Sequence, residues 1–314
     1  MANFEWSFDA PSGTYKNFSL SADLRSAAVA ESKFMQFVRP ESGYGRKSGE
    51  SITIARVSNL ALPTSGKLTE GLKIPEDSLS ISSIAISVSE WGRAVPYTSL
   101  SDDLSKFDME SIVQKELMKQ MRLVLDGACA GAFKQCKVKA ESTSVSGVQF
   151  RTGGAFVATS TNQLSVAHVE LIRDYMYKDL FVPAYEGDDY ICIVSTKAKR
   201  GLLSDPAWED WHKYTDPQAK YNGEIGRLEN IRFIETNNNS ALSNAVGTNN
   251  IGEAVFFGAD AVVMAVALDP ELRAGIPGDF GRQKAVAWYG IMEFGLVWDT
   301  ANAGEAKVIH FGSL

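Results

Sequence analysis

Two strand-like segments joined by a long polar stretch constrain the fold of this chain more than any other feature. Ser51–Val57 alternates apolar and polar side chains, and residues 79–88 carry a second such run. The alternation of the second run slips at Ser82 and Ser83, which predicts a bulge. Residues 62–77 between the runs are polar, with prolines and glycines, and form a charged tip. About twenty residues per side would reach on the order of 60 Å.

An isolated hairpin of that length is marginally stable in water. It needs a partner surface, and a compact monomer offers no obvious place for one. The hairpin therefore predicts a self-assembling structural chain rather than an enzyme that works alone.

A long helix is predicted directly after the hairpin, over residues 105–135, with Ser105 or Asp108 as its N-cap. Its apolar side chains recur at helical spacing, and its second half is rich in glycine and alanine, which allows close packing. The helix would be about 45 Å long and far exceeds the usual length of roughly 11–12 residues. We interpret it as the spine of a domain.

The remaining segments indicate an α+β fold in which most strands are antiparallel. Residues 1–36 are polar and are interpreted as an arm, with a short helix over residues 21–37. Further helices are predicted over residues 164–179 and Thr196–Leu203. Strands are predicted on either side of a turn at Gly153 and Gly154, and over Tyr190–Ser195, 228–235, 254–258, 261–267, 285–289, 296–298 and 306–310.

Composition narrows the class of protein. The 314 residues are 45% hydrophobic and 22% charged, which excludes a largely disordered chain. No apolar run approaches the ~20 residues that span a bilayer, and the N-terminus lacks the pattern of a signal peptide. The net charge is −7 and no basic face is evident, so we expect only loose, non-specific contact with nucleic acid.

Residues that usually carry catalysis or bind metals are sparse. The cysteines lack metal-ligand spacing and are predicted to be buried core residues: Cys129, Cys136 and Cys192. The histidines form no metal-binding motif; His168 is expected in the first turn of a helix and His310 near a strand end. No nucleophile elbow, P-loop or dinucleotide-binding motif follows a strand. We therefore predict no catalytic residue, no cofactor and no metal.

Two other features keep alternatives open. The acidic pairs Asp102-Asp103 and Asp188-Asp189 are best interpreted as solvated charges, although a carboxylate enzyme remains an alternative. Trp208 and Trp211 belong to an aromatic patch in a polar loop predicted over residues 205–222. That loop is predicted to fold onto its own domain or to dock a neighbouring subunit, which we favour over a ligand pocket.

Three stretches resemble a known family. They are residues 67–71 (KLTEG) followed by 90–98 (EWGRAVPYT), residues 223–236 (GEIGRLENIRFIET), and residues 256–261 (FFGADA) followed by 279–283 (DFGRQ). Their order and spacing resemble the major capsid proteins of tailed bacteriophages with the HK97 fold, within them the N4 gp56-like family. Asn230 stands where a glycine is usual in that family, and asparagine tolerates the left-handed conformation.

The resemblance implies a domain organisation. It implies an N-terminal arm (1–36), an extended loop with flanking strands (37–103, the E-loop itself at about 46–90) and a peripheral domain with the spine helix (104–161). An axial domain (162–268) and C-terminal strands that return to the peripheral domain (269–314) complete it.

The resemblance also implies partners. Copies of the chain would form hexamers and pentamers of an icosahedral shell, with portal and scaffolding proteins, in some relatives a decoration protein, and packaged double-stranded DNA; no membrane is implied. The virion would be assembled in the host cytoplasm. Candidates for contacts between E-loop and neighbouring subunit are Arg56, Lys67, Glu70, Lys73 and Glu76, and for axial-domain contacts Trp208 and Trp211. An encapsulin-like cellular compartment with the same fold is a second alternative.

Overall fold

The computed structural model describes residues 30–41, 49–60, 63, 65–105, 107–157, 160, 162–214, 224–242 and 252–314, without the side chains of residues 211–214. Residues 1–29 of the arm predicted over residues 1–36, and of the helix predicted over residues 21–37, lie outside the described residues. Within residues 30–37 the predicted helix is present only as the short 3-10 helix η1 (Met35–Phe37). No helix in the described ranges has the length and apolar character needed to cross a membrane.

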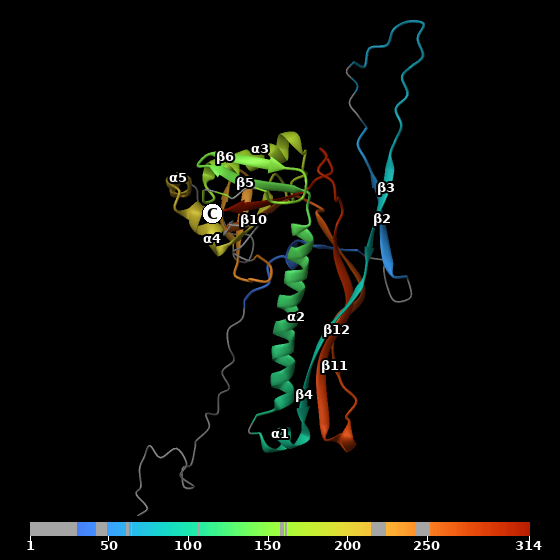
Figure 1. Cartoon of the computed structure of the whole chain (residues 1–314), viewed down its shortest axis with the longest axis vertical. Coiled ribbons are helices and arrows are strands. Elements are labelled where there is room, and N and C mark those ends of the chain that lie inside the picture. The colour runs from blue at the N-terminus through green and yellow to red at the C-terminus, as the bar shows by residue number, and fades with distance from the viewer. Residues whose placement is uncertain are drawn as a thin grey trace, which may run out of the picture.

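A seven-stranded mixed sheet forms the body of the molecule (Figure 1). Its strands, in spatial order, are β6 (Gly147–Arg151), β5 (Val138–Ser144), β13 (Val308–Ser313), β10 (Gly252–Phe257), β7 (Tyr190–Ser195), β9 (Ile231–Thr236) and β8 (Glu224–Leu228). Helices cover one face of this sheet, and a hydrophobic core lies between them and the strands. The helices are α3 (Val166–Asp174), its π-helical continuation η2 (Tyr175–Asp179), α4 (Thr196–Leu203) and α5 (Pro206–Tyr214). The opposite face of the central strands packs on the end of α2 (Met109–Lys134) and on η1 (Met35–Phe37).

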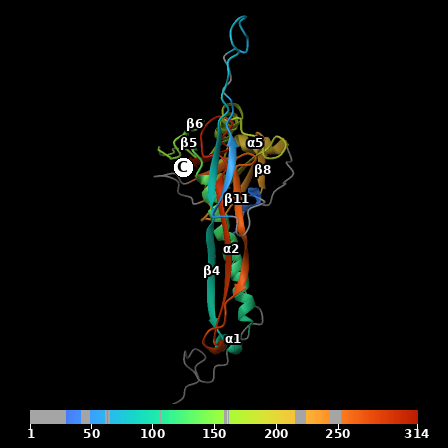
Figure 2. The same cartoon turned by 90° about the vertical axis from the view of Figure 1, so that its right-hand side faces the viewer.

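A long limb extends from this body (Figures 1 and 2). It contains α2, the short helix α1 (Ser99–Leu104), and a four-stranded sheet in the order β1 (Arg39–Glu41), β11 (Val262–Ala274), β12 (Gln283–Leu296) and β4 (Ser89–Thr98). Val113 and Leu117 of α2 pack on Val286 and Trp288 of β12. This apolar contact packs the long helix against the sheet, and the turn that contains η3 (Asp279–Gly281) closes the far end of the limb.

The predicted hairpin is present as a separate two-stranded sheet, β2 (Ser51–Val57) and β3 (Ile81–Ser87). Its root packs through Ile52, Ile54 and Ile86 on Val263 and Ala265 of β11 and on Val297, and its tip leads away from the rest of the chain (Figure 1). The pairing of β2 with β3 is continuous, so the bulge predicted at Ser82 and Ser83 is wrong. The pattern slipped only because Ile81 lies on the exposed face.

The long helix begins later than predicted. Thr98 caps α1, and a break separates it from α2, whose N-cap Asp108 accepts the N–H of Glu110 at 3.1 Å. Of the two predicted caps, Asp108 is therefore confirmed and Ser105 is not. The helix predicted over residues 164–179 is confirmed as α3 with η2, and the helix predicted over Thr196–Leu203 is confirmed as α4. Seven of the ten strand pairings in the described chain are antiparallel, as expected.

Two turns differ from prediction. The turn between β5 and β6 lies at Val145 and Ser146, whereas Gly154 follows β6 and donates its N–H to Lys137 O at 2.9 Å with φ +80°. The single strand predicted over residues 228–235 is two strands, β8 and β9, joined by Glu229 and Asn230 at positive φ. Two consecutive left-handed residues form the tight hairpin turn that antiparallel strands favour, and Asn230 takes the expected conformation.

Candidate functional site

The root of the hairpin is held to its own chain by Arg56. Its guanidinium donates to Asp299 Oδ1 at 2.5 Å and to Val297 O at 3.3 Å, and it lies over the Trp298 ring. Only 11% of its side chain is exposed. Arg56 was predicted to contact a neighbouring subunit, but the structure shows its guanidinium engaged within the subunit.

The other four predicted contact residues lie at the exposed tip: Lys67, Glu70, Lys73 and Glu76. Lys73 and Glu76 pair with each other at 2.5 Å, which is an exposed contact of about 0–1 kcal/mol. Large apolar side chains are also uncovered along this tip, at Leu68, Leu72 and Ile74. A tip that exposes both kinds of side chain away from the body is typical of an interaction surface.

A second uncovered apolar region lies at the far end of the limb. Ile276 and Phe280 of the turn between β11 and β12 are almost fully exposed, and Leu100 and Leu104 of α1 are 66% and 79% exposed. Asp279 and Phe280 both have positive φ, a conformation that is costly for residues other than glycine. The backbone thus holds an aromatic ring in solvent, which sequence periodicity could not indicate.

Trp208 and Trp211 lie on helix α5, not in a loop as predicted. The Trp208 indole is 5% exposed and packs edge-on against Phe233 at 5.4 Å. Trp208 therefore belongs to the core beside the seven-stranded sheet. This matches the prediction that the segment folds onto its own domain, the alternative to docking a neighbouring subunit. The side chain of Trp211, like residues 215–223, lies outside the described part.

Asp126 is a functional candidate that sequence analysis missed. It is fully buried in α2, and its Oδ1 accepts the backbone N–H groups of Lys33 and Phe34 at 2.9 and 2.8 Å, while Oδ2 accepts from Asn238 at 3.1 Å. The carboxylate thereby fixes the segment before β1 on the spine helix. A single acidic residue within the small-sided, apolar half of the helix was the available signal.

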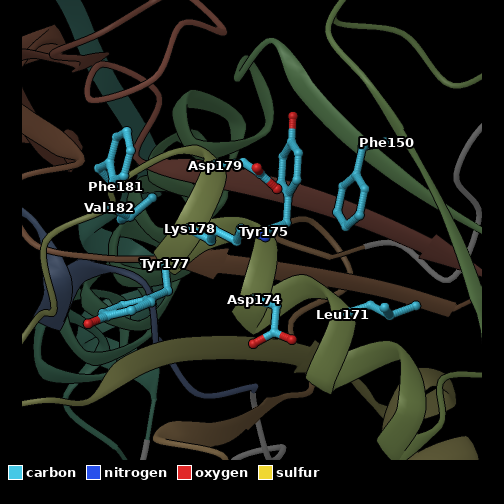
Figure 3. Close-up of a pocket in the computed structure, with 9 residues that line it drawn as sticks. All are labelled: Phe150, Leu171, Asp174, Tyr175, Tyr177, Lys178, Asp179, Phe181 and Val182. Atoms are coloured by element: carbon cyan, nitrogen blue, oxygen red, sulfur yellow. The ribbon is translucent and has the colours of Figure 1, made fainter. Parts of the chain in front are cut away.

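The described residues show no arrangement typical of catalysis. An open pocket of about 900 Å³ beside η2 is lined by aromatic, aliphatic and charged side chains, with Phe150 and Tyr175 stacked at 3.9 Å (Figure 3). Asp102 pairs with Lys284 at 3.2 Å at the end of the limb, and Asp189 pairs with Arg232 at 2.7 Å in the body. The two acidic pairs thus lie on different parts of the fold, and Asp102 and Asp189 each pair with a cation.

The predicted burial of all three cysteines is confirmed. Burial raises the pKa of Cys136 to about 11, and also raises the pKa values of Cys129 and Cys192. His168 lies in the first turn of α3, as predicted, where Nδ1 accepts the N–H of Ser165 at 3.2 Å and burial lowers its pKa. No group of three metal-ligating side chains occurs among the residues that the structure describes.

Known structures share this architecture along the whole chain. The head structure of Helicobacter pylori bacteriophage KHP40 matches with a TM-score of 0.71 and 13% identity, covering 100% of this chain and 98% of that one. The cyanophage Pam1 capsid asymmetric unit matches with a TM-score of 0.73 and 14% identity, covering 100% and 99%. The capsid of Ralstonia phage GP4 matches with a TM-score of 0.67 and 16% identity, covering 98% of each chain.

No family model and no curated protein matches this sequence. The structural likeness nevertheless extends over the seven-stranded body, the limb with its long helix and the projecting hairpin. The chain therefore has the α+β, HK97-like fold of bacteriophage capsid proteins.

Proposed function

We propose that this chain is the major capsid protein of a tailed bacteriophage, with a structural rather than a catalytic role. Copies would assemble into hexamers and pentamers of an icosahedral head that encloses double-stranded DNA. The observation that carries the proposal is the projecting hairpin, whose apolar tip is uncovered in its own chain, on a fold that matches phage capsids along its whole length.

The hairpin tip is the proposed contact with a neighbouring copy. Lys67, Glu70, Lys73 and Glu76 would give charge pairs that are weak one by one, and Leu68, Leu72 and Ile74 would supply apolar area. Because each contact is repeated around a closed shell, small free energies of association add up. Arg56 has a supporting role here, since it fixes the root from which the tip projects.

The finer assignment follows from the sequence motifs. We propose membership of the N4 gp56-like family on residues 67–71, 223–236 and 256–261. The proposed peripheral domain is residues 104–161 with the spine helix, and the proposed axial domain is residues 162–268. Portal, scaffolding and decoration proteins are proposed partners, assembly would occur in the host cytoplasm, and the net charge of −7 fits a shell that encloses DNA without gripping it.

Electron microscopy of the purified, concentrated chain tests the proposal. We expect closed shells built of hexamers and pentamers. A chain that stays monomeric under every assembly condition and is absent from virus particles would overturn it. An encapsulin-like compartment would instead be recognised by a cargo enzyme encoded beside this gene in place of portal and terminase genes.

A further inference from the structure

A buried cluster of ionisable groups lies where the end of α2 meets the seven-stranded sheet. His310 of β13 is paired in register with Lys139 of β5, and Glu253 comes from β10 on the other side. The three residues are 4%, 4% and 1% exposed. None of the three belongs to the proposed assembly contacts at the hairpin tip.

Hydrogen bonds fix the state of the His310 ring. The Lys139 ammonium has only donors and lies 3.0 Å from Nδ1, so Nδ1 acts as the acceptor. The ring proton is therefore on Nε2, which donates to Glu253 Oε1 at 2.7 Å. The imidazole is neutral and held between one cation and one carboxylate.

The same lysine connects the sheet to the long helix. Lys139 Nζ donates to the carbonyl oxygen of Lys134, the last residue of α2, at 2.6 Å. The ammonium of Lys134 lies 3.5 Å from Glu253 Oε1, and the thiol of Cys136 lies 3.9 Å from Lys139 Nζ. Phe156 covers the cluster, edge-on to the His310 ring at 4.9 Å.

We propose that His310 is an acid-sensitive lock between the spine helix and the seven-stranded sheet. A proton taken up from solvent at Nδ1 converts the ring to an imidazolium that faces the Lys139 ammonium. The hydrogen bond between them is lost and the two positive charges repel each other. Lys139 then leaves the carbonyl of Lys134, and the helix end separates from the sheet.

The charges around His310 set the direction of this response. Lys139 and Lys134 oppose protonation, and Glu253 favours it; Glu141, also on β5, is paired with Arg151 at 2.7 Å. Burial, reinforced by the two lysines, lowers the pKa of His310 from 6.5 to about 4.

The sign of the pH effect follows from linkage. A histidine in the opened state has its ordinary pKa of 6.5, so the opened state binds the proton first as the pH falls. Opening is favoured progressively from pH 6.5 down to about 4, and the lock is closed at neutral pH.

Hydrogen exchange of the full-length, unassembled chain tests the lock. After correction for intrinsic exchange, protection of the amides in residues 132–139 should fall about tenfold per pH unit between about pH 6 and pH 4. His310→Gln keeps a donor for Glu253 and an acceptor for Lys139 but cannot titrate, so its protection should not change with pH in this window. His168→Gln, at a buried histidine outside the cluster, should behave as the unmodified chain does at residues 132–139.

A second variant covers the case in which His310→Gln does not fold. Lys139→Met removes the ammonium opposite Nδ1, so the pKa of His310 in the closed state should rise toward 6.5. The loss of protection should then level off at a higher pH and be smaller in total than in the unmodified chain. The proposal is overturned if His310→Gln keeps the tenfold slope, if Lys139→Met loses as much protection by pH 4 as the unmodified chain does, or if the unmodified chain keeps its protection down to pH 4.

Discussion

The carboxylate of Asp126 accepts the backbone N–H of Phe34 at 2.8 Å, across 92 residues of sequence. The bond holds Phe34 where its aromatic ring packs against Phe133, 5.5 Å away between ring centres; Phe133 lies on α2, as Asp126 does. The segment that leads into β1 and the hairpin is therefore positioned from the middle of the spine.

Replacing Asp126 should destabilise the fold more than any surface change on α2. Asp126→Ala leaves the buried N–H groups of Lys33 and Phe34 without their acceptor, which should cost roughly 2–4 kcal/mol of unfolding free energy in urea. Asp108→Ala removes an exposed N-cap from the same helix and should cost only about 1 kcal/mol. Equal losses for the two variants would contradict the role assigned to Asp126.

Deleting residues 63–77 should separate folding from assembly. The core clusters do not include this tip, so the circular dichroism spectrum of the variant should remain that of a folded subunit. Shells should be absent by electron microscopy. Loss of the folded spectrum would count against an independent tip.

A point substitution gives a milder version of that experiment. Leu72 at the tip and Val145 in the turn between β5 and β6 are both 73% exposed. Leu72→Ser should raise the concentration at which shells form, whereas Val145→Ser should leave it unchanged, with light scattering as the measurement. The same effect from both variants would argue for non-specific stickiness instead of a tip contact.

The Arg56–Asp299 pair should contribute a small, pH-dependent coupling. The hydrogen bond from Arg56 lowers the pKa of Asp299 below 3.8, so the contribution is present at neutral pH and is lost as the pH falls through that lowered pKa. Because Asp299 is largely exposed, a double-mutant cycle with alanine at both positions should give only about 0.5–1 kcal/mol. A coupling that persists below the pKa of Asp299 would contradict this origin.

Glycine 295 of β12 should not tolerate a side chain. A Cβ there would lie 2.6 Å from Ile86 Cδ1, at the root of the hairpin, so Gly295→Ala should cost roughly 1–3 kcal/mol by forcing Ile86 away. Gly131→Ala meets no atom within 4 Å on α2 and should stabilise the helix by about 0.5–1 kcal/mol. Thermal unfolding of the two variants, with shifts of opposite sign, checks both statements.

Local patterns in the sequence predicted the elements whose signals are continuous. The buried run Tyr190–Ser195 and the helix Thr196–Leu203 have the predicted bounds, because Ser195 both ends the strand and caps the helix. The hairpin and the long helix were likewise found from alternation and helical spacing, with an error at the helix start.

Features that depend on contacts between distant residues could not be predicted. β12 was expected as two short strands because Gly290 and Gly295 interrupt its pattern, yet these glycines admit Pro270 and Ile86 at close range. The partners of Asp126 and His310 lie 92 and 57 residues away, so no window of sequence indicates them. Of the predicted contact residues, the structure shows the tip charges exposed and Arg56 already in use.

The position of β13 has a consequence for synthesis of the chain. It lies between β5 and β10 in the seven-stranded sheet. β5 is made more than a hundred residues before β13, and β10 about fifty residues before it. Until Val308–Ser313 leaves the ribosome, β5 and β10 have no strand between them and the body cannot close. A chain that is cut short before this point lacks the strand that joins β5 to β10, so its seven-stranded sheet cannot form.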